Sequence, residues 1–293
     1  MKIGISTTVT ARSADLAAVA RLVESLGYDS LWIPEHPVIP LQRSIPFPAS
    51  PDGQMPEHYM QWADPFIALT VAATVTQTIK LGTGVCLLPE RDPLITAKVV
   101  ASLDLYSQGR VILGVGAGWL KEETEVMGTK FSQRWKRLRE TVEAMRELWT
   151  QPAASYAGEL ISFPAVRCEP KPVQRPGPPI LLGGLGPQVL QRVARSYDGW
   201  YPFVASLDAF AKDMAMLRTL TREAGRDPDA LHITAIIDPR NGTVSVDDLK
   251  RYRDAGAQRI VVYSQQTRQE DADGKGLEVV TRSAPIVERA QHV

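Results

Sequence analysis

His36 is the residue of this chain best suited to moving a proton. It stands three residues past Ile33, the last apolar residue of an expected strand. Imidazole binds and releases a proton near neutral pH, so a histidine at the edge of a site can act as an acid or a base. A surface histidine bonded to local backbone would have the same sequence position, and both interpretations stay open. Glu35 either orients this imidazole or is a solvated loop carboxylate.

A long loop follows His36. It is rich in proline and runs to about residue 62 without a regular apolar period. A loop of this length in a compact domain is usually functional. Tyr59, Met60 and Trp62 stand near its end, where they would exclude water and shape an apolar pocket. We therefore expect a lid with these three residues facing the substrate.

Glycines mark the exits of two further strands. Gly82 and Gly84 lie within one strand, where glycine indicates either a close approach of ligand to backbone or tight packing. The next strand runs into Gly-x-Gly-x-Gly at residues 114–118. The dinucleotide fingerprint would need its third glycine at Trp119, so this motif does not predict a Rossmann site. Backbone N–H groups at such an exit can still approach an anion or a flat ring.

A third glycine-rich exit precedes a helix. Gly183, Gly184, Leu185 and Gly186 are followed by Pro187, a residue favoured at the first helical position. Free N–H groups and the positive end of the helix dipole make such a turn a phosphate site. A tight barrel turn would also use glycine, and that alternative stays open.

Short apolar segments alternate with segments of helical period along the whole chain. We expect strands at Lys2–Ser6, Ser30–Ile33, Lys80–Cys86, Val111–Val115, Ile180–Leu182, Gly199–Pro202, Ile233–Ile237 and Arg259–Tyr263. Eight βα units in one domain favour a closed (β/α)8 TIM barrel over a doubly wound sheet. In such a barrel the loops that follow the strands carry the function. We predict a single domain over residues 1–293, with insertions after strands 2 and 4.

Helices are expected between these strands and after the last one. They are predicted at 16–26, Pro65–Thr76, Pro93–Tyr106, Ser132–Trp149, Pro187–Ser196, Leu207–Ala224, Val246–Ala255 and within Leu277–Arg289. The second insertion covers residues 150–178. It contains a hairpin turn at 157–159, a short strand at Leu160–Phe163 and a proline-rich run.

Composition excludes several classes of function. Lys+Arg and Asp+Glu both number 33, so no clustered positive charge predicts a nucleic-acid partner. Two cysteines and scattered histidines predict neither a disulfide framework nor a metal site. The longest apolar run, Phe66–Val75, is about half of what a membrane span needs. The beginning of the chain lacks the pattern of a signal peptide, so we expect a cytoplasmic protein.

Taken together, these segments resemble the luciferase-like monooxygenase family. The matching pieces occur in family order over roughly residues 1–203 and are Pro34-Glu35-His36, Leu81-Gly82-Thr83-Gly84-Val85, Gly109-Arg110 to Gly118-Trp119, Pro170-Lys171-Pro172-Val173-Gln174 and Asp198-Gly199-Trp200. The subgroup it looks most like uses the deazaflavin coenzyme F420. In one place the chain departs from many relatives: Leu120 stands where they carry Asn.

The resemblance implies roles for particular residues. His36 matches an active-site histidine at the reactive edge of the ring, and Gly84–Val85 matches a non-prolyl cis peptide behind the ring. The other matches are to cofactor-binding segments: Gly116, Gly118 and Trp119 along the cofactor, and Gly184, Leu185 and Gly186 at its phosphate.

The resemblance predicts hydride transfer between reduced F420 and a small organic substrate, with His36 as proton donor or charge stabiliser. It implies a homodimer and a separate reductase or dehydrogenase that supplies the reduced cofactor. Three alternatives stay open. They are a two-component monooxygenase that uses reduced FMN, a flavin-binding barrel without catalysis, and a phosphate-binding lyase or isomerase barrel.

Overall fold

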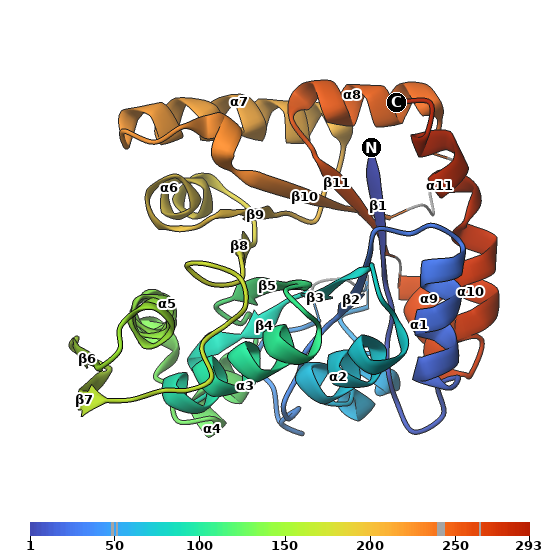
Figure 1. Ribbon diagram of the computed structural model, residues 1–293. Coiled ribbons are helices and arrows are strands. Elements are labelled where there is room, and N and C mark those ends of the chain that lie inside the picture. Colours follow the sequence, from blue (N-terminus) through green and yellow to red (C-terminus); the bar gives the residue numbers. More distant parts are fainter. Residues whose placement is uncertain (48–49, 51, 239–243, 264) are drawn as a thin grey trace.

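The computed structural model describes residues 1–47, 50, 52–238, 244–263 and 265–293. Within these residues the chain forms a closed barrel of parallel strands surrounded by helices (Figure 1). The eight barrel strands are β1 (Lys2–Ser6), β2 (Ser30–Ile33), β3 (Lys80–Thr83), β5 (Val111–Gly116), β8 (Ile180–Gly183), β9 (Gly199–Tyr201), β10 (His232–Ile237) and β11 (Arg259–Val262). The predicted (β/α)8 fold is therefore confirmed.

These strands follow one another around the barrel in chain order. β3 pairs with β5 through Gly82 opposite Ile112, and the short strand β4 (Cys86–Leu87) continues beside the end of β5. The ring closes where β11 pairs with β1, with Ile260 opposite Ile3. Every barrel pair is parallel, so the carboxyl ends of all eight strands lie on one rim and the loops that follow them meet there.

Two stacked aromatic rings fill the interior of the barrel. Trp32 from β2 and Tyr201 from β9 are buried, and their ring centroids lie 4.7 Å apart. A Cβ atom added to Gly82 would lie 2.2 Å from the Trp32 ring, so a larger residue would not fit at this position. Gly82 therefore serves packing, which was one of its two predicted interpretations.

Helices cover the outside of the barrel (Figure 1). They are α1 (Leu16–Ser25), α2 (Pro65–Val75), α3 (Pro93–Tyr106), α4 (Lys121–Val126), α5 (Arg134–Thr150), α6 (Pro187–Ser196), α7 (Leu207–Glu223), α8 (Val246–Ala255), α9 (Gln265–Ala272), α10 (Gly276–Ser283) and α11 (Pro285–Ala290). Asp15, Asp64 and Asp92 begin the first three because their carboxylates accept hydrogen bonds from first-turn N–H groups. Pro65 and Pro93 occupy first-turn positions where no N–H is needed.

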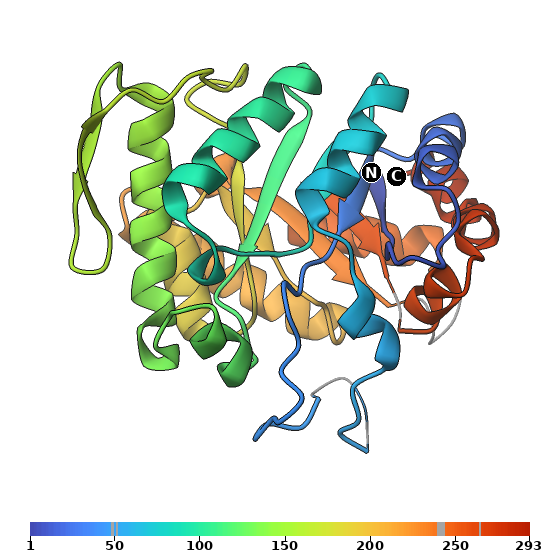
Figure 2. The ribbon, with the colours of Figure 1, turned by 90° about the horizontal axis from the view of Figure 1, so that it is seen from below.

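The first insertion covers the rim of the barrel. It joins β2 to α2, extends away from the barrel body in Figure 2, and contains the 3-10 helix η1 (Glu57–Gln61). His58 Nδ1 lies 2.9 Å from Gln269 Oε1 of α9, and the hydroxyl oxygens of Tyr59 and Tyr263 are 3.4 Å apart. The end of this insertion, which we call the lid, is thus held against the segment that follows β11.

The second insertion is a two-stranded hairpin outside α5, formed by β6 (Ala154–Ala157) and β7 (Ser162–Val166) (Figures 1 and 2). A strand was predicted at Leu160–Phe163, but β7 begins two residues later, at Ser162. The backbone N–H groups of Leu160 and Ile161 donate to the Glu140 carboxylate at 2.8 and 3.0 Å instead of joining the ladder. A side chain of α5 therefore sets where the strand begins.

Two parts of the helical prediction need correction. The sequence interpretation omitted α4 and α9, which are short and polar and show no clear apolar period. The single last helix expected within Leu277–Arg289 is two helices. α10 ends at Ser283 and α11 begins with Pro285, since proline has no N–H to continue the preceding helix.

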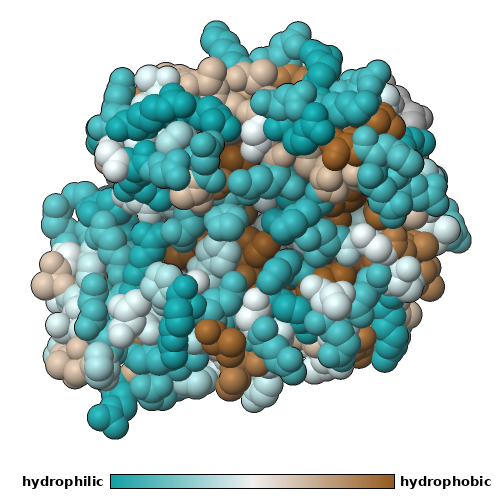
Figure 3. Space-filling view, turned by 45° about the horizontal axis from the view of Figure 1, so that its top comes forward, coloured by the Kyte–Doolittle hydropathy of each residue, from teal (hydrophilic) through white to brown (hydrophobic). Residues whose placement is uncertain are grey.

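The described surface has two further features. The two ends of the chain lie side by side, with the Met1 amino group 3.2 Å from the Ala290 carbonyl oxygen. On the face drawn in Figure 3, hydrophilic residues predominate and apolar residues form separate patches. Each helix of the described residues is too short or too polar to cross a membrane.

Candidate active site

His36 lies at the C-terminal rim, and its side chain is buried, with 6% exposed. Nδ1 of its ring lies 2.7 Å from Oε2 of Glu123, a residue of α4 that is 87 positions away in the chain. Three aromatic rings surround the imidazole: the centroids of Tyr59, Trp62 and Trp119 are 5.9, 5.3 and 6.2 Å from its own. The imidazole is therefore held in one orientation, with Nε2 as its second proton-transfer atom.

Burial controls the charge of this pair. It lowers the pKa of His36, and the Arg268 guanidinium lowers that pKa further. Burial also raises the pKa of the Glu123 carboxyl group. Both shifts favour the uncharged form. In their uncharged forms, the Glu123 carboxylic acid donates to Nδ1 of His36 and the imidazole carries its N–H on Nε2.

A second buried carboxyl group lies near the first. Glu90 ends the 3-10 helix η2 (Leu88–Glu90), and its Oε1 accepts a hydrogen bond of 2.9 Å from Thr124 Oγ1. Burial and the neighbouring Glu123 carboxyl group raise the pKa of Glu90 to about 8. Burial therefore favours the protonated form of both carboxyl groups at this rim.

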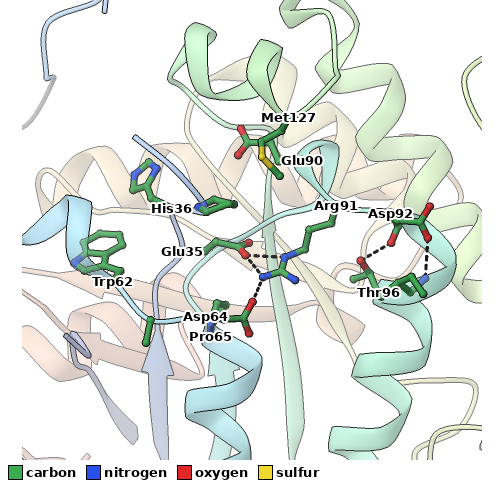
Figure 4. A pocket seen from close by; sticks show the side chains of 13 residues that line it. Glu35, His36, Trp62, Asp64, Pro65, Glu90, Arg91, Asp92, Thr96 and Met127 are labelled. Atoms are coloured by element: carbon green, nitrogen blue, oxygen red, sulfur yellow. Dashed lines mark hydrogen bonds and ion pairs between the residues drawn. The ribbon is translucent and has the colours of Figure 1, made fainter. Parts of the chain in front are cut away.

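Glu35 does not bind the imidazole. Its Oε2 accepts a hydrogen bond of 2.7 Å from the Leu87 N–H, and its Oε1 accepts one of 2.7 Å from Arg91 Nε. Arg91 also pairs with Asp64 at the start of α2 (Figure 4). Glu35 thus ties the end of β2 to the segment after β3, and the carboxyl group that orients His36 is Glu123.

The lid contributes two of its three predicted residues to the site. Tyr59 and Trp62 lie 4.3 Å apart between ring centroids, and both lie near His36. Met60 lies partly in solvent, with 46% of the residue exposed. Trp119 closes the other side, 5.8 Å from Phe47 between ring centroids.

The exits of β3 and β5 meet at Val85. The peptide bond between Gly84 and Val85 is cis, as the resemblance predicted. A Cβ atom on Gly116 would lie 2.7 Å from the Val85 side chain, so glycine is needed for these strands to approach. Gly118 has φ of +78°, a conformation that favours glycine. Packing against Val85 therefore explains why glycine occupies position 116 at the exit of β5.

The exit of β8 has a different character. Gly184 and Gly186 have φ of +114° and +93°, and Leu185 between them is 53% exposed. No side chain caps the first turn of α6, and Pro187 occupies the start of that turn. A Cβ atom on Gly186 would meet no atom within 4 Å, so there is space for a side chain here. Glycine is required at this position because of the backbone conformation.

A cavity of about 370 Å³ opens beside His36. Its lining comes from the rim and from the first turns of α2 and α3, namely Glu35, His36, Pro37, Trp62, Ala63, Asp64, Pro65, Glu90, Arg91, Asp92, Ile95, Thr96 and Met127. Figure 4 shows His36 and Trp62 on one side of it and Asp92 with Thr96 on the other. His36 and Glu90 thus line the same cavity.

Glu123 and Glu90 were not singled out in the sequence. Glu123 follows Lys121 and Glu122, so it has the appearance of a solvated helix start. Its distance of four residues from Trp119 is the only local sign that it returns to the rim. Within the described residues, no group of three or more His, Cys, Asp and Glu side chains is arranged to hold a metal ion.

A buried histidine–carboxyl pair and glycine-lined strand exits on one rim are typical of a ligand-binding barrel enzyme. The chain belongs to the luciferase-like monooxygenase family, whose model matches residues 1–239. This confirms the family that the sequence resembles.

Several relatives are similar over most of the chain. An uncharacterised protein of Mycobacterium tuberculosis is 40% identical over 229 residues, 78% of this chain and 80% of the relative. A 5,10-methylenetetrahydromethanopterin reductase of Archaeoglobus fulgidus is 30% identical over 262 residues, 89% of this chain and 69% of the relative. The fold also resembles that of a solved F420-dependent secondary alcohol dehydrogenase, with a TM-score of 0.72. The match covers 96% of this chain and 98% of the dehydrogenase chain. At 18% sequence identity it supports the fold alone.

Proposed function

We propose that this protein is an oxidoreductase that transfers a hydride between reduced coenzyme F420 and a small organic substrate at the C-terminal rim of its barrel. The observation that carries the proposal is the buried His36–Glu123 hydrogen bond at the C-terminal rim, where β3 also leads into the cis peptide Gly84–Val85. Relatives with F420-dependent names support the choice of cofactor, among them an F420-dependent glucose-6-phosphate dehydrogenase of Amycolatopsis mediterranei, 32% identical over 64% of this chain and 52% of that relative.

The residues at the rim fit a flat phosphorylated cofactor. Val85 follows the cis peptide bond and packs against Gly116, and we assign its side chain to the back of the ring. The uncapped first turn of α6 after Gly186 fits a phosphate, since its N–H groups lack side-chain partners. Gly118, Trp119, Gly184 and Leu185 complete the predicted cofactor contacts. When bound, the deazaflavin supplies the hydride, and the protein supplies orientation and protons.

His36 and Glu123 form the proton-transfer unit of this proposal. The pair holds two protons and no net charge, with one proton on Nε2. His36 Nε2 gives this proton to the substrate heteroatom as the neighbouring carbon is reduced, and the Glu123 proton moves to Nδ1. The product gains one proton and the pair becomes an imidazole with a carboxylate. Glu90 and the cavity beside it lie where solvent can return the lost proton.

The lid serves to exclude water. Tyr59 and Trp62 cover His36, and the bonds from the lid to Gln269 and Tyr263 hold it over the rim. A dry site strengthens the hydrogen bonds made inside it. We assign Tyr59 and Trp62 to the substrate side, with Met60 at the outer edge of the lid.

Cofactor titration tests this proposal directly. We expect F420 to quench tryptophan fluorescence on binding, with a dissociation constant at least about tenfold below that of FMN, as the F420-dependent relative suggests. Reduced F420 should then be oxidised by small carbonyl compounds. Oxygen uptake that depends on reduced FMN would instead identify a two-component monooxygenase. Tight binding without turnover on any oxidant would identify a non-catalytic flavin-binding barrel.

The proposal includes partners and a setting. A separate reductase or dehydrogenase regenerates the reduced cofactor, and the protein acts in the cytoplasm as a homodimer. The exposed apolar residues on α2 and α3, Ile67, Val71 and Ile95, support association through that side of the barrel.

A further inference from the structure

Arg268 differs from the other buried arginines among the described residues. Arg110 and Arg259 are as buried as Arg268, but both have partners. The Arg110 guanidinium donates to Thr76 Oγ1 and to four backbone carbonyl groups, and Arg259 pairs with Asp29 at 2.5 Å. Nε of Arg268 has no hydrogen-bond partner in the described part of the chain, although only 6% of the residue is exposed. A buried guanidinium with an unused donor needs an explanation.

Aromatic rings surround this guanidinium. Its Cζ lies 4.2 Å from the ring centroid of Tyr263, 4.7 Å from that of Trp62 and 5.9 Å from that of Tyr59. Cation–π contacts offset part of the cost of burying the charge. Such contacts use the faces of the rings and leave the Nε–H of the guanidinium without an acceptor among the described residues. The aromatic residues therefore hold Arg268 in place without accepting a hydrogen bond from its Nε–H.

Arg268 and the proton-transfer unit lie on the same side of the barrel. Trp62 contacts both, since its ring centroid is 5.3 Å from that of His36. Arg268 belongs to α9, in the loop region after the eighth barrel strand, where barrels often bind anions. Nε1 of Trp62 is a second buried donor without an acceptor among the described residues. Both unused groups can only donate, so the ligand that satisfies them must accept.

We propose that Arg268 and Trp62 bind a carboxylate group of the substrate, so that the substrate of this enzyme is a small organic acid with an apolar body. This inference rests on the proposed function only in calling the bound acid a substrate.

The guanidinium of Arg268 carries one positive charge and presents its N–H donors in a plane. These properties match the single negative charge and planar shape of a carboxylate. The Asp271 carboxyl group lies one turn further along α9, and its Oδ2 accepts hydrogen bonds from Thr7 Oγ1 and the Thr8 N–H. The rings of Tyr59 and Tyr263 provide the apolar walls for the rest of the acid.

The test uses benzoate and its neutral counterpart benzamide on the whole protein without cofactor. Trp62 fluorescence reports binding, because its ring lies against Arg268. We expect benzoate to bind roughly 10- to 100-fold more tightly than benzamide, the value of a charge-assisted hydrogen bond. Arg268→Gln should remove this preference and Arg268→Lys should keep part of it. Arg251→Gln, which removes an exposed arginine paired with Asp208, is the matched control and should keep all of it.

Three results would overturn the proposal. They are equal binding of both probes to the natural protein, a preference that survives Arg268→Gln, and a preference for inorganic phosphate over benzoate. A loss of F420 binding in Arg268→Lys, with circular dichroism unchanged, would assign the arginine to the cofactor and also count against it. Because benzoate binding is measured without cofactor, it can fail while the cofactor titration succeeds, and the reverse also holds.

Discussion

At the scale of single residues, the site centres on two buried groups that share a hydrogen bond, His36 and Glu123. His36 and Glu123 are both removed from water, and burial favours the neutral form of each. A histidine in bulk water would be bonded to solvent and free to rotate. Here one nitrogen is engaged, so the proton available to a ligand is on the other.

Replacing His36 by Ala tests this role. Cofactor affinity should change by less than about twofold, while turnover should fall on the order of 10²–10⁴-fold, the usual contribution of a general acid. Glu123→Gln keeps a hydrogen bond to Nδ1 but cannot pass on a proton in the same way, so its turnover should fall less and lose its dependence on pH. Fluorescence titration and stopped-flow oxidation of reduced F420 measure the two effects. Unchanged turnover in His36→Ala would remove the histidine from the mechanism.

Glu90 provides a test of stability against pH. Its carboxyl pKa is raised to about 8 in the folded protein from an ordinary value of 4.5, so folding favours the protonated form. The resulting loss of stability is absent below pH 4.5, grows as pH rises, and is complete above about pH 8. Glu90→Gln should therefore raise the melting temperature at pH 8.5 and leave it nearly unchanged at pH 4.5.

The control for that experiment is Glu140→Gln. Glu140 is equally buried, but its carboxylate accepts backbone N–H groups of the hairpin, which an amide cannot all satisfy. It should lower the melting temperature at pH 8.5. A fall of stability in Glu90→Gln at pH 8.5 would contradict the assignment of a protonated Glu90.

At the scale of elements, the first turn of α6 is the part that the cofactor proposal needs most. Gly186 has a backbone conformation, φ +93° and ψ 164°, that is almost restricted to glycine. Because a Cβ there meets no neighbouring atom, substitution changes the turn and not the packing around it.

Gly186→Ala should weaken cofactor binding by about tenfold or more, with a stability loss of about 1–3 kcal/mol. Gly225→Ala is matched to it, since Gly225 also has positive φ with no atom near its Cβ position but lies after α7. That control should lose a similar stability and bind cofactor normally. Equal affinities in the two variants, measured by fluorescence titration and thermal melts, would show that this turn does not hold the phosphate.

At the scale of the whole molecule, α2 and α3 present apolar residues to the outside. Ile67 of α2 is 69% exposed and Ile95 of α3 is 64% exposed, and these helices pack against each other. The helix α2 is apolar on nearly all sides, which is typical of a helix that is covered on more than its core face. Exposed apolar residues on two adjoining helices are consistent with the proposed association through this side of the barrel.

Ile67→Asp should therefore convert a dimer to a monomer, because a charge buried between two copies has no partner. Light scattering after size-exclusion chromatography gives the mass directly. Met216→Asp, on the exposed side of α7, should leave the mass unchanged. A dimer that persists in Ile67→Asp would place the interface elsewhere.

The sequence by itself determined the barrel, the rim and His36, because strands and helices leave local periods and because glycine and proline mark where they end. The bounds of β1, β2, α3, α6 and α8 agree with those predicted. Long-range contacts leave no such signal. Only the folded chain decided that Glu123 and not Glu35 binds His36, and that Arg268 lies against Trp62. Those pairs depend on loops from different strands meeting at one rim, and burial there, not sequence position, sets their charge.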